Sequence, residues 1–315
     1  MDEAIDKQLL KVLEFIKSYL PVEICFISAR RGKLETLKWA SKQKYIWDSV
    51  LLDQATEGGH LEIIKWLHKK GYFPERDVSP LAAFWGHIHI LEWCKEKNCK
   101  WTAYTCFMAA NGGHLEILKW LRANGCLWDE STCYGATEKG NLKILKWARK
   151  NGCPWDSWTF TKAMYPGDTK VIEWLIKKGC PFNEDTCASA AISGNLKALQ
   201  WLRENGCPWD GQVCSDAAEM GYLEVLQWAR ENGCPWDEDV CTLAALNGHL
   251  QLLQWARENG CPWDAGTSIS AIKRNDLEML KWVCSRGCPL DENSKSIACI
   301  YDSKDVLQWL KENFP

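Results

Sequence analysis

The stretch ENGCPWDEDVCTLAALNGHLQLLQWARENGCPWD, residues 231–264, contains the segment ENGCPWD twice, 27 residues apart. The same interval runs through most of the chain. Tryptophan recurs every 27 residues, without insertion or deletion, at positions 39, 66, 93, 120, 147, 174, 201, 228, 255, 282 and 309. A constant internal period of roughly 20 to 50 residues is typical of an array in which each repeat packs only on its neighbours. The 315 residues are therefore predicted to form one solenoid.

One repeat, taken from residue 236 to residue 262, has the pattern of two short helices joined by a tight turn. Asp237 can cap the first helix by accepting an early backbone N–H. Asn247-Gly248 is a turn signal, and residues 249–257 place their apolar positions on one broad helical face. Asn259-Gly260 then ends the second helix. Because neither helix can bury its apolar face alone, successive repeats are expected to stack.

This repeat resembles a known family. The segments AALNGHLQLL, at Ala244–Leu253, and AANGGHLEIL, at Ala109–Leu118, both resemble the ankyrin repeat, and the resemblance extends from about Val22 to Pro315. Two features depart from it. The repeat has 27 residues where ankyrin has about 33, and Asp239–Thr242 replaces the usual Thr-Pro-Leu-His opening. The chain is similar to the fingerless, Trp- and Cys-rich ankyrin variety of large DNA viruses and protists.

The resemblance implies an all-α, ankyrin-like helix-turn-helix solenoid of about 10–11 repeats without β-hairpin fingers. It implies a protein-interaction scaffold that holds its partner on the concave face made by the first helices. Within a single domain, 1–315, we expect an N-terminal capping helix in 1–20, repeats over 21–303 and a C-terminal capping helix in 304–315. The resemblance also implies a structural hydrogen bond for four histidines at one repeat position: His60, His87, His114 and His249.

The helix tryptophans are predicted to form the structural core, because truncating a buried Trp to Ala costs about 3–5 kcal/mol. We expect five of them to be nearly inaccessible to solvent: Trp120, Trp147, Trp201, Trp228 and Trp255. A second tryptophan column lies eight residues further on, in the loops, and is expected to pack beneath them as a second seam. A surface row of aromatic rings that contacts a ligand is the alternative for this column.

The 17 cysteines follow the same period. Their spacing within a repeat, as in Cys234 and Cys241, lacks the close CxxC pairs of zinc sites, so we expect no metal site. Free thiols that pack as small apolar groups are predicted instead. No P-loop, nucleophile elbow or HExxH segment occurs, and we expect no catalytic residue and no cofactor.

The net charge of −3 argues against a polyanion as the main partner. No run of 18 apolar residues and no secretory signal is present, so we expect no membrane insertion. We predict a monomer that binds a protein partner. We expect it in the cytoplasm or nucleus, of a host cell if the source is viral. Nucleic-acid or anionic-surface binding is the alternative, through the basic N-terminal repeat: Arg30, Arg31, Lys33, Lys38, Lys42 and Lys44.

Positions that vary between repeats are expected to contact the partner, whereas constant positions hold the stack together. Large aromatic side chains gather at variable positions of the first helices and the turns after them. Such side chains are enriched in interface hot spots. The candidate partner-binding residues are Phe84, Trp85, Tyr104, Phe107, Met108, Tyr134, Trp158 and Tyr165. Filling of gaps between irregular repeats is the alternative role for some of them.

Overall fold

The computed structural model describes residues 23–43, 47–72 and 77–314. These residues form 22 α-helices, arranged as eleven successive pairs, and no strand. The prediction of an all-α solenoid of paired helices with a 27-residue repeat is therefore confirmed for the part of the chain that is described. The chain divides into two compact bodies, an N-terminal body of residues 1–155 and a C-terminal body of residues 156–315.

Each pair consists of a first helix, a tight turn and a second helix. In the N-terminal body the first helices are α2 (Glu23–Arg30), α4 (Val50–Glu57), α6 (Ser79–Trp85), α8 (Ala103–Asn111) and α10 (Glu130–Glu138). The second helices are α3 (Leu34–Lys42), α5 (Leu61–Lys69), α7 (Ile88–Glu96), α9 (Leu115–Ala123) and α11 (Leu142–Lys150).

The C-terminal body repeats this arrangement. Its first helices are α12 (Ser157–Met164), α14 (Glu184–Ile192), α16 (Gln212–Glu219), α18 (Glu238–Asn247), α20 (Ala265–Lys273) and α22 (Ser294–Ile300). Its second helices are α13 (Thr169–Lys177), α15 (Leu196–Glu204), α17 (Leu223–Glu231), α19 (Leu250–Glu258), α21 (Leu277–Ser285) and α23 (Lys304–Asn313). Helix α23 occupies the segment expected to hold the C-terminal capping helix. The N-terminal capping helix expected in 1–20 lies outside the described residues, and the single domain remains a prediction.

Local signals in the sequence define the helix ends. The side chain of Asp237 accepts a hydrogen bond from the backbone N–H of Asp239 at 3.1 Å, so it caps α18 as expected. Gly260 follows α19 with a φ of +85°, which favours glycine because that region of φ strains residues with a Cβ. The backbone N–H of Cys261 then donates to Ala256 at 3.0 Å and closes the helix.

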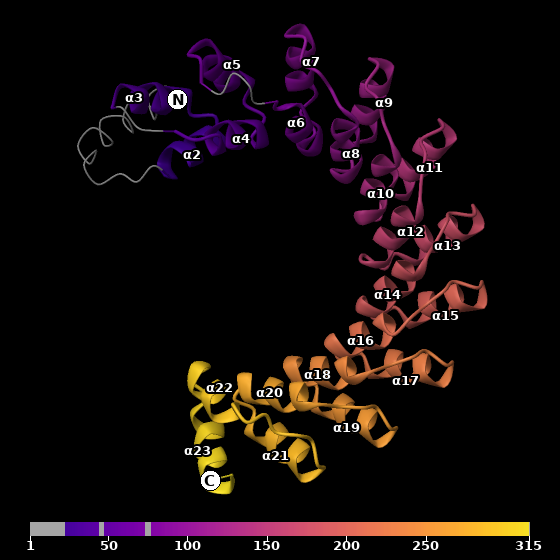
Figure 1. Ribbon diagram of the computed structural model, residues 1–315. Coiled ribbons are helices and arrows are strands. Elements are labelled where there is room, and N and C mark those ends of the chain that lie inside the picture. The colour runs from indigo at the N-terminus through magenta and orange to yellow at the C-terminus, as the bar shows by residue number, and fades with distance from the viewer. Residues whose placement is uncertain (1–22, 44–46, 73–76, 315) are drawn as a thin grey trace. The chain divides into compact units, whose positions relative to one another are not determined.

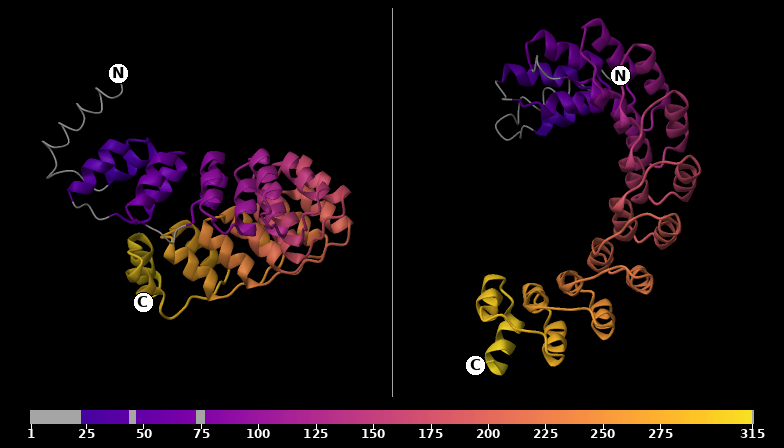
Figure 2. Two further views of the ribbon diagram at one scale, coloured as in Figure 1. Left: turned by 90° about the horizontal axis from the view of Figure 1, so that it is seen from above. Right: turned by 45° about the vertical axis from the view of Figure 1, so that its right-hand side comes forward.

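In each body the two kinds of helix form two layers (Figures 1 and 2). First helices of neighbouring repeats pack closely, whereas second helices of neighbouring repeats stand further apart, so the first helices form the inner layer. Small side chains permit the close approach, since helix separation depends on the side chains at the contact. In α18, for example, Ala244 and Ala245 are completely buried.

The five core tryptophans are only half-buried, so the expectation of near-complete burial is wrong for Trp120, Trp147, Trp201, Trp228 and Trp255. The reason is geometric. Leucine and alanine side chains on the inner faces of the second helices fill the space between the layers; in α19 these are Leu252, Leu253 and Ala256. Tryptophan at the adjacent position lies at the side of the second helix, where an indole ring finds room in the gap between neighbouring second helices.

The cysteines behave as predicted. All 17 are free thiols, 14 are buried, and only Cys299 is exposed. Several buried thiols also donate a hydrogen bond to the backbone carbonyl of the residue that precedes the first helix of their own repeat, for example Cys261 to Asp237 at 3.3 Å. Burial raises the pKa of the Cys288 thiol to about 12. The Cys288 thiol therefore stays protonated and donates to the Asp264 carbonyl at 3.3 Å.

The hydrogen bonds expected for the histidines are present at three of the four positions. His60 Nε2 donates to the Arg30 carbonyl at 2.9 Å, His87 to Glu57 at 2.9 Å, and His249 to Glu219 at 3.0 Å. The ring of His114 packs over Gly86, whose φ is +88°. Each of these rings thereby joins the start of a second helix to the turn of the preceding repeat.

Candidate binding surfaces

The predicted aromatic residues of the N-terminal body lie on its inner layer. Tyr104 and Phe107 on α8 stack with ring centroids 5.5 Å apart, and Phe107 contacts Tyr134 on α10 at 5.4 Å. The three rings therefore form a row that connects two successive first helices. Tyr104 is 55% exposed, whereas Phe107 and Tyr134 are half-buried.

A second contact lies at the end of α6. The rings of Phe84 and Trp85 meet edge to face at 5.2 Å, and Trp85 is 41% exposed. Met108, on α8, is half-buried. Helices α6 and α8 carry no charged residue, so the first-helix surface that presents Trp85 and Tyr104 is apolar.

Phe107 also packs between repeats. A Cβ atom added at Gly135 of α10 would lie 2.7 Å from a Phe107 ring carbon, so this ring occupies the space that the glycine leaves. The gap-filling alternative therefore applies to Phe107, while Trp85 and Tyr104 keep enough exposure to contact a partner.

The two remaining candidates lie in the C-terminal body. Trp158 on α12 and Tyr165, its C-terminal cap residue, are 52% and 55% exposed. The ammonium of Lys162 lies 6.0 Å from the Trp158 ring centroid and 5.6 Å from that of Tyr165. Both rings therefore lie within cation–π distance of one ammonium group.

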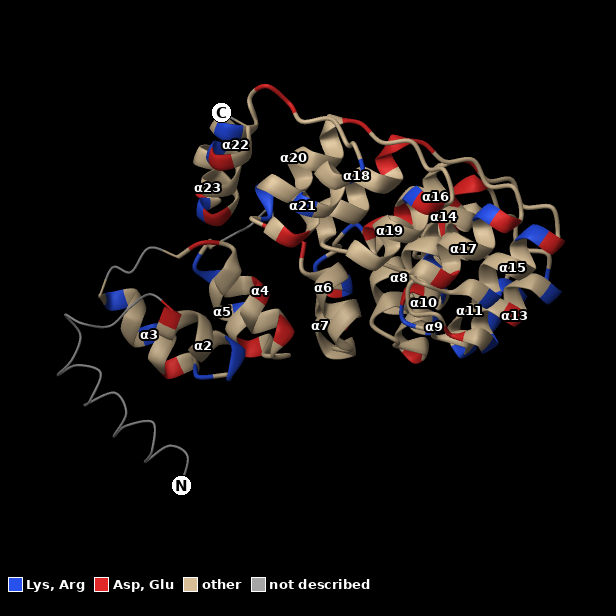
Figure 3. Cartoon of the chain, turned by 90° about the horizontal axis from the view of Figure 1, so that it is seen from below, with Lys and Arg blue, Asp and Glu red and all other residues tan. Residues whose placement is uncertain are grey.

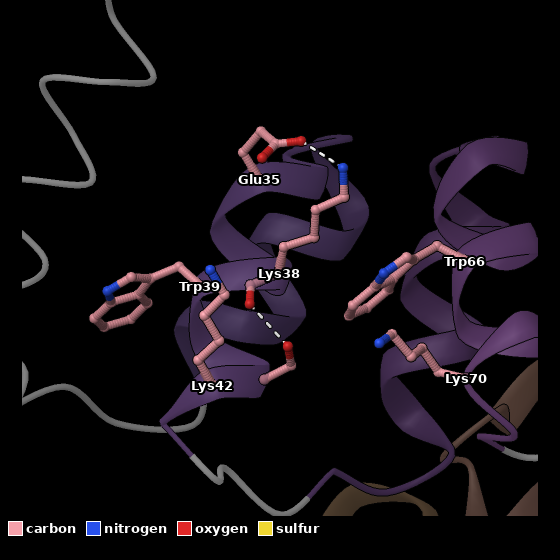
Figure 4. A pocket seen from close by; sticks show the side chains of 7 residues that line it. Glu35, Lys38, Trp39, Lys42, Trp66 and Lys70 are labelled. Atoms are coloured by element: carbon pink, nitrogen blue, oxygen red, sulfur yellow. Dashed lines mark hydrogen bonds and ion pairs between the residues drawn. The ribbon is translucent and has the colours of Figure 1, made fainter.

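A groove between α3 and α5 is a second type of surface. Its cavity has a volume of about 430 Å³ and is lined by Glu35, Lys38, Trp39, Ser41, Lys42, Trp66 and Lys70. Figure 4 shows the Trp66 ring projecting from α5 toward α3, while the Trp39 ring extends to the opposite side of α3. Lys38, Lys42 and Lys70 line the same cavity as Trp66, and Lys38 is held by Glu35 at 2.7 Å.

An equivalent groove lies seven repeats further on, between α17 and α19. It measures about 400 Å³ and is lined by Gln227, Arg230, Glu231, Trp236, Trp255 and Asn259. The guanidinium of Arg230 lies 4.1 Å over the Trp236 ring and also donates to the Cys234 carbonyl, so it fills part of this groove.

The two grooves differ in charge at matching positions. Gln227, Glu231 and Asn259 correspond to Lys38, Lys42 and Lys70, and Ser41 stands in place of Arg230. Three lysines and one glutamate give the α3–α5 groove a formal charge of +2. One arginine and one glutamate make the α17–α19 groove neutral. Figure 3 shows how Lys and Arg recur on the second helices.

The basic N-terminal stretch is only partly available for an anionic partner. Arg30 pairs with Glu57 at 2.6 Å, and Lys44 lies outside the described residues. Lys38 and Lys42 do reach the groove, together with Lys70 and Trp66, which sequence reasoning missed. A comparison of residue identity at matching repeat positions could have identified Lys70, because asparagine stands at that position in several later repeats.

Other kinds of site are not found in the described part of the chain. Over residues 23–43, 47–72 and 77–314, no three His, Cys, Asp or Glu side chains converge as metal ligands. In the same residues no helix combines the length and the apolar character needed to cross a membrane.

Comparison with known proteins gives no family. No family model matches the sequence, and no curated protein matches it. Among solved structures, the chain is similar to two crystal structures of the pentatricopeptide repeat protein PPR10 in complex with an 18-nt psaJ RNA element, the second with three cysteine-to-serine substitutions. In both, identity is 12%, the TM-score is 0.47, and the match covers 92% of this chain and 53% of the other. The chain thus spans about half of their length. Ankyrin identity receives no support from these matches.

Proposed function

We propose that the chain is a helical repeat scaffold that binds a protein partner on the inner layer of its N-terminal body. The observation that carries this proposal is the aromatic row of Tyr104, Phe107 and Tyr134, with Trp85 nearby, on first helices that are largely uncharged. A repeat array presents an extended surface of this kind. The shortened ankyrin variety remains our hypothesis for its ancestry.

The chemistry of this surface favours a protein over a polyanion. Helices α6 and α8 carry no charged residue, and α10 contributes Glu130 and Glu138. A polyanion needs positive side chains to replace its counterions, and this surface offers none on these three helices. Exposed aromatic rings instead suit the desolvated centre of a protein interface. We further propose that binding, and not catalysis, is the activity of the chain.

The test uses Tyr104→Ser and Trp85→Ser variants, with Leu127→Ser as the matched control. Leu127 is 72% exposed but lies in a loop of the same body. A partner captured by the wild-type chain from cell extract should bind the control normally. Each inner-layer variant should lose about 2 kcal/mol, or roughly 30-fold in affinity, by calorimetry. Wild-type affinity in both folded variants would exclude this surface.

A second candidate function rests on the charge of the α3–α5 groove. We propose that this groove binds a nucleic acid or another anionic surface. The observation that favours it is the presence of Lys38 and Lys42 where the α17–α19 groove has Gln227 and Glu231, so that lysines line the same cavity as an indole. A Lys38→Gln/Lys42→Glu double variant restores the residues of the neutral groove. It should weaken binding of an oligonucleotide and flatten its dependence on salt concentration. Binding that stays equally tight would remove this candidate.

A further inference from the structure

Trp66 is a pre-positioned ring at the base of the α3–α5 groove. One side of the ring is supported by Trp47, whose indole lies 5.8 Å away and is itself buried. Trp47 is held in turn by Tyr72 at 5.2 Å. The Trp66 ring therefore has little freedom to turn, while it remains partly open to the groove. A ring fixed in this way loses little entropy when a planar ligand stacks on it.

The groove lacks the arginine that covers the loop tryptophan in other repeats. In the α17–α19 groove, Arg230 lies over Trp236. Ser41 occupies the matching position here, and its hydroxyl donates to the Lys38 carbonyl at 2.8 Å, so it turns back onto its own helix. The α3–α5 groove therefore has no guanidinium at the position that Arg230 occupies in the α17–α19 groove.

The positive charge continues into the next repeat. Lys65, Lys69 and Lys97 stand one repeat after Lys38, Lys42 and Lys70, and all three are exposed. Within the described residues Lys42 and Lys70 form no ion pair, and Lys65 pairs with Glu62 at 3.0 Å. Positive charges repeated at a regular interval suit a polymer of phosphates better than one isolated phosphate.

The two indole rings along this basic strip, Trp66 and Trp93, differ in accessibility. Trp93 is only 9% exposed and the His68 ring packs against it at 5.5 Å, whereas Trp66 is partly exposed. The α3–α5 groove therefore offers the more accessible indole. A flat bilayer surface could reach the lysines, but it would not reach a ring that lies between two helices. A flexible single strand can place a base there while its phosphates stay at the rim.

We propose that the α3–α5 groove binds single-stranded nucleic acid, with one base stacked on Trp66 and the flanking phosphates paired with Lys38, Lys42 and Lys70. This inference rests on the second candidate function above, and it adds the kind of ligand and the ring that receives the base. Stacking on an aromatic ring tolerates any base, because every base presents a π face. Recognition is therefore expected to depend on single-strandedness and not on sequence.

The experiment measures anisotropy of a labelled thymidine oligomer of about ten nucleotides on the full chain. An abasic sugar–phosphate oligomer of the same length serves as the second probe. The wild-type chain should bind the thymidine oligomer about 5- to 150-fold more tightly than the abasic one, as one stacked base predicts. Trp66→Leu should weaken only the thymidine oligomer. The Lys38→Gln/Lys42→Glu variant should weaken both, whereas Lys304→Gln, a change at an exposed lysine of the C-terminal body, should weaken neither.

The outcomes distinguish base stacking on Trp66 from anion binding by charge alone. Equal binding of both oligomers that is lost in the lysine variant would overturn base stacking and leave charge-based anion binding in place. Binding of phosphatidylserine vesicles without binding of either oligomer would assign the groove to a membrane surface and overturn the nucleic-acid proposal. Failure to bind any of the three probes would overturn both the base-stacking proposal and the anion-binding proposal. If Trp66→Leu does not fold, the comparison of the two oligomers on the wild-type chain still decides whether a base is stacked.

Discussion

The indole ring of Trp128 lies 5.8 Å from the indole of Trp147, and the two ring planes are inclined by 67°. Trp128 belongs to a loop and Trp147 to α11, so the contact joins the loop to the outer layer. The guanidinium of Arg122 lies over the Trp128 ring, 4.2 Å from the ring centroid. Equivalent tryptophan pairs occur in other repeats: Trp47–Trp66, Trp101–Trp120, Trp209–Trp228, Trp236–Trp255 and Trp263–Trp282.

Truncation of Trp147 is expected to destabilise the N-terminal body substantially, although the ring is only half-buried. We predict that Trp147→Ala lowers the free energy of unfolding by about 2–3 kcal/mol, below the full cost of about 3–5 kcal/mol for a completely buried aromatic ring. Urea denaturation measures this loss. Trp147→Phe, the matched control, keeps part of the contact with Trp128 and should recover about half of it. A Trp147→Ala variant as stable as the wild-type chain would show that the ring is a surface feature.

Two glycines allow backbone strain to be separated from steric contact. Gly59 and Gly125 have φ values of +74° and +82°. A Cβ at Gly59 would lie 2.6 Å from the His87 ring, whereas a Cβ at Gly125 would meet nothing within 4 Å. Gly125→Ala should therefore cost only about 1 kcal/mol, from the left-handed backbone. Gly59→Ala should cost clearly more, because it also displaces the ring that bonds to Glu57. Equal melting temperatures for the two variants would contradict this reading of the turn.

Asp216 on α16 gives the stability of the C-terminal body a dependence on pH. Burial raises the pKa of this carboxyl above its ordinary value of 3.8, although Gln212 donates to it at 2.6 Å. Between 3.8 and the raised pKa the folded chain binds more protons than the unfolded chain, so this group lowers stability as pH rises through that window. Asp216→Asn should therefore melt at a higher temperature than the wild type at pH 7.

The advantage of the Asp216→Asn variant should shrink as pH falls and vanish below about 3.8, where the carboxyl is protonated in both states. Melting temperatures across a pH series measure this. Glu204→Gln, at an exposed position on α15, controls for the change in net charge. An advantage for Asp216→Asn that stays constant with pH would show that burial of the charge is not its cause.

Thiol reactivity should distinguish one cysteine from the others. The native chain is expected to react quickly with a disulfide reagent at Cys299, which is exposed, and more slowly at Cys99 and Cys284, which are partly covered. Burial raises the pKa of both slower thiols, and the thiolate is the reactive form. The other thiols should react only after unfolding. Mass spectrometry of the labelled chain identifies the modified thiols. Fast modification of many thiols in the folded chain would contradict the burial of the cysteines.

The parts of the fold that depend on neighbouring residues could be predicted from the sequence. Asp237 caps a helix and Gly260 ends one because each acts within a few residues of its own position. The degree of burial of Trp255 could not be predicted in the same way. It depends on how far apart α17 and α19 stand, and this spacing is set by packing between repeats.

The candidate sites, like the fold, could be predicted only where a feature depends on residues close together in the sequence. The sequence indicated Lys38 and Lys42 as parts of a basic segment, but the groove also requires Trp66 and Lys70 from the next repeat. Contacts between repeats likewise decided that Phe107 fills the space over Gly135 while Tyr104 remains exposed. The stacking of arginine on the loop tryptophans was missed, although the constant spacing of six residues, as in Arg122 and Trp128, was a visible signal.

The hydrogen bonds that link successive repeats have a genetic consequence. The His249 ring donates to the backbone carbonyl of Glu219, 30 positions earlier, and His60 and His87 make the same bond over the same interval. Because the acceptor is a backbone carbonyl, which every repeat supplies, a recombination event that removes or duplicates 27 codons leaves each of these donors with an equivalent acceptor. An event of any other length changes the spacing between the donor and the acceptor on either side of it. Changes of length in whole repeats are therefore expected to be tolerated better than in-frame changes of other sizes.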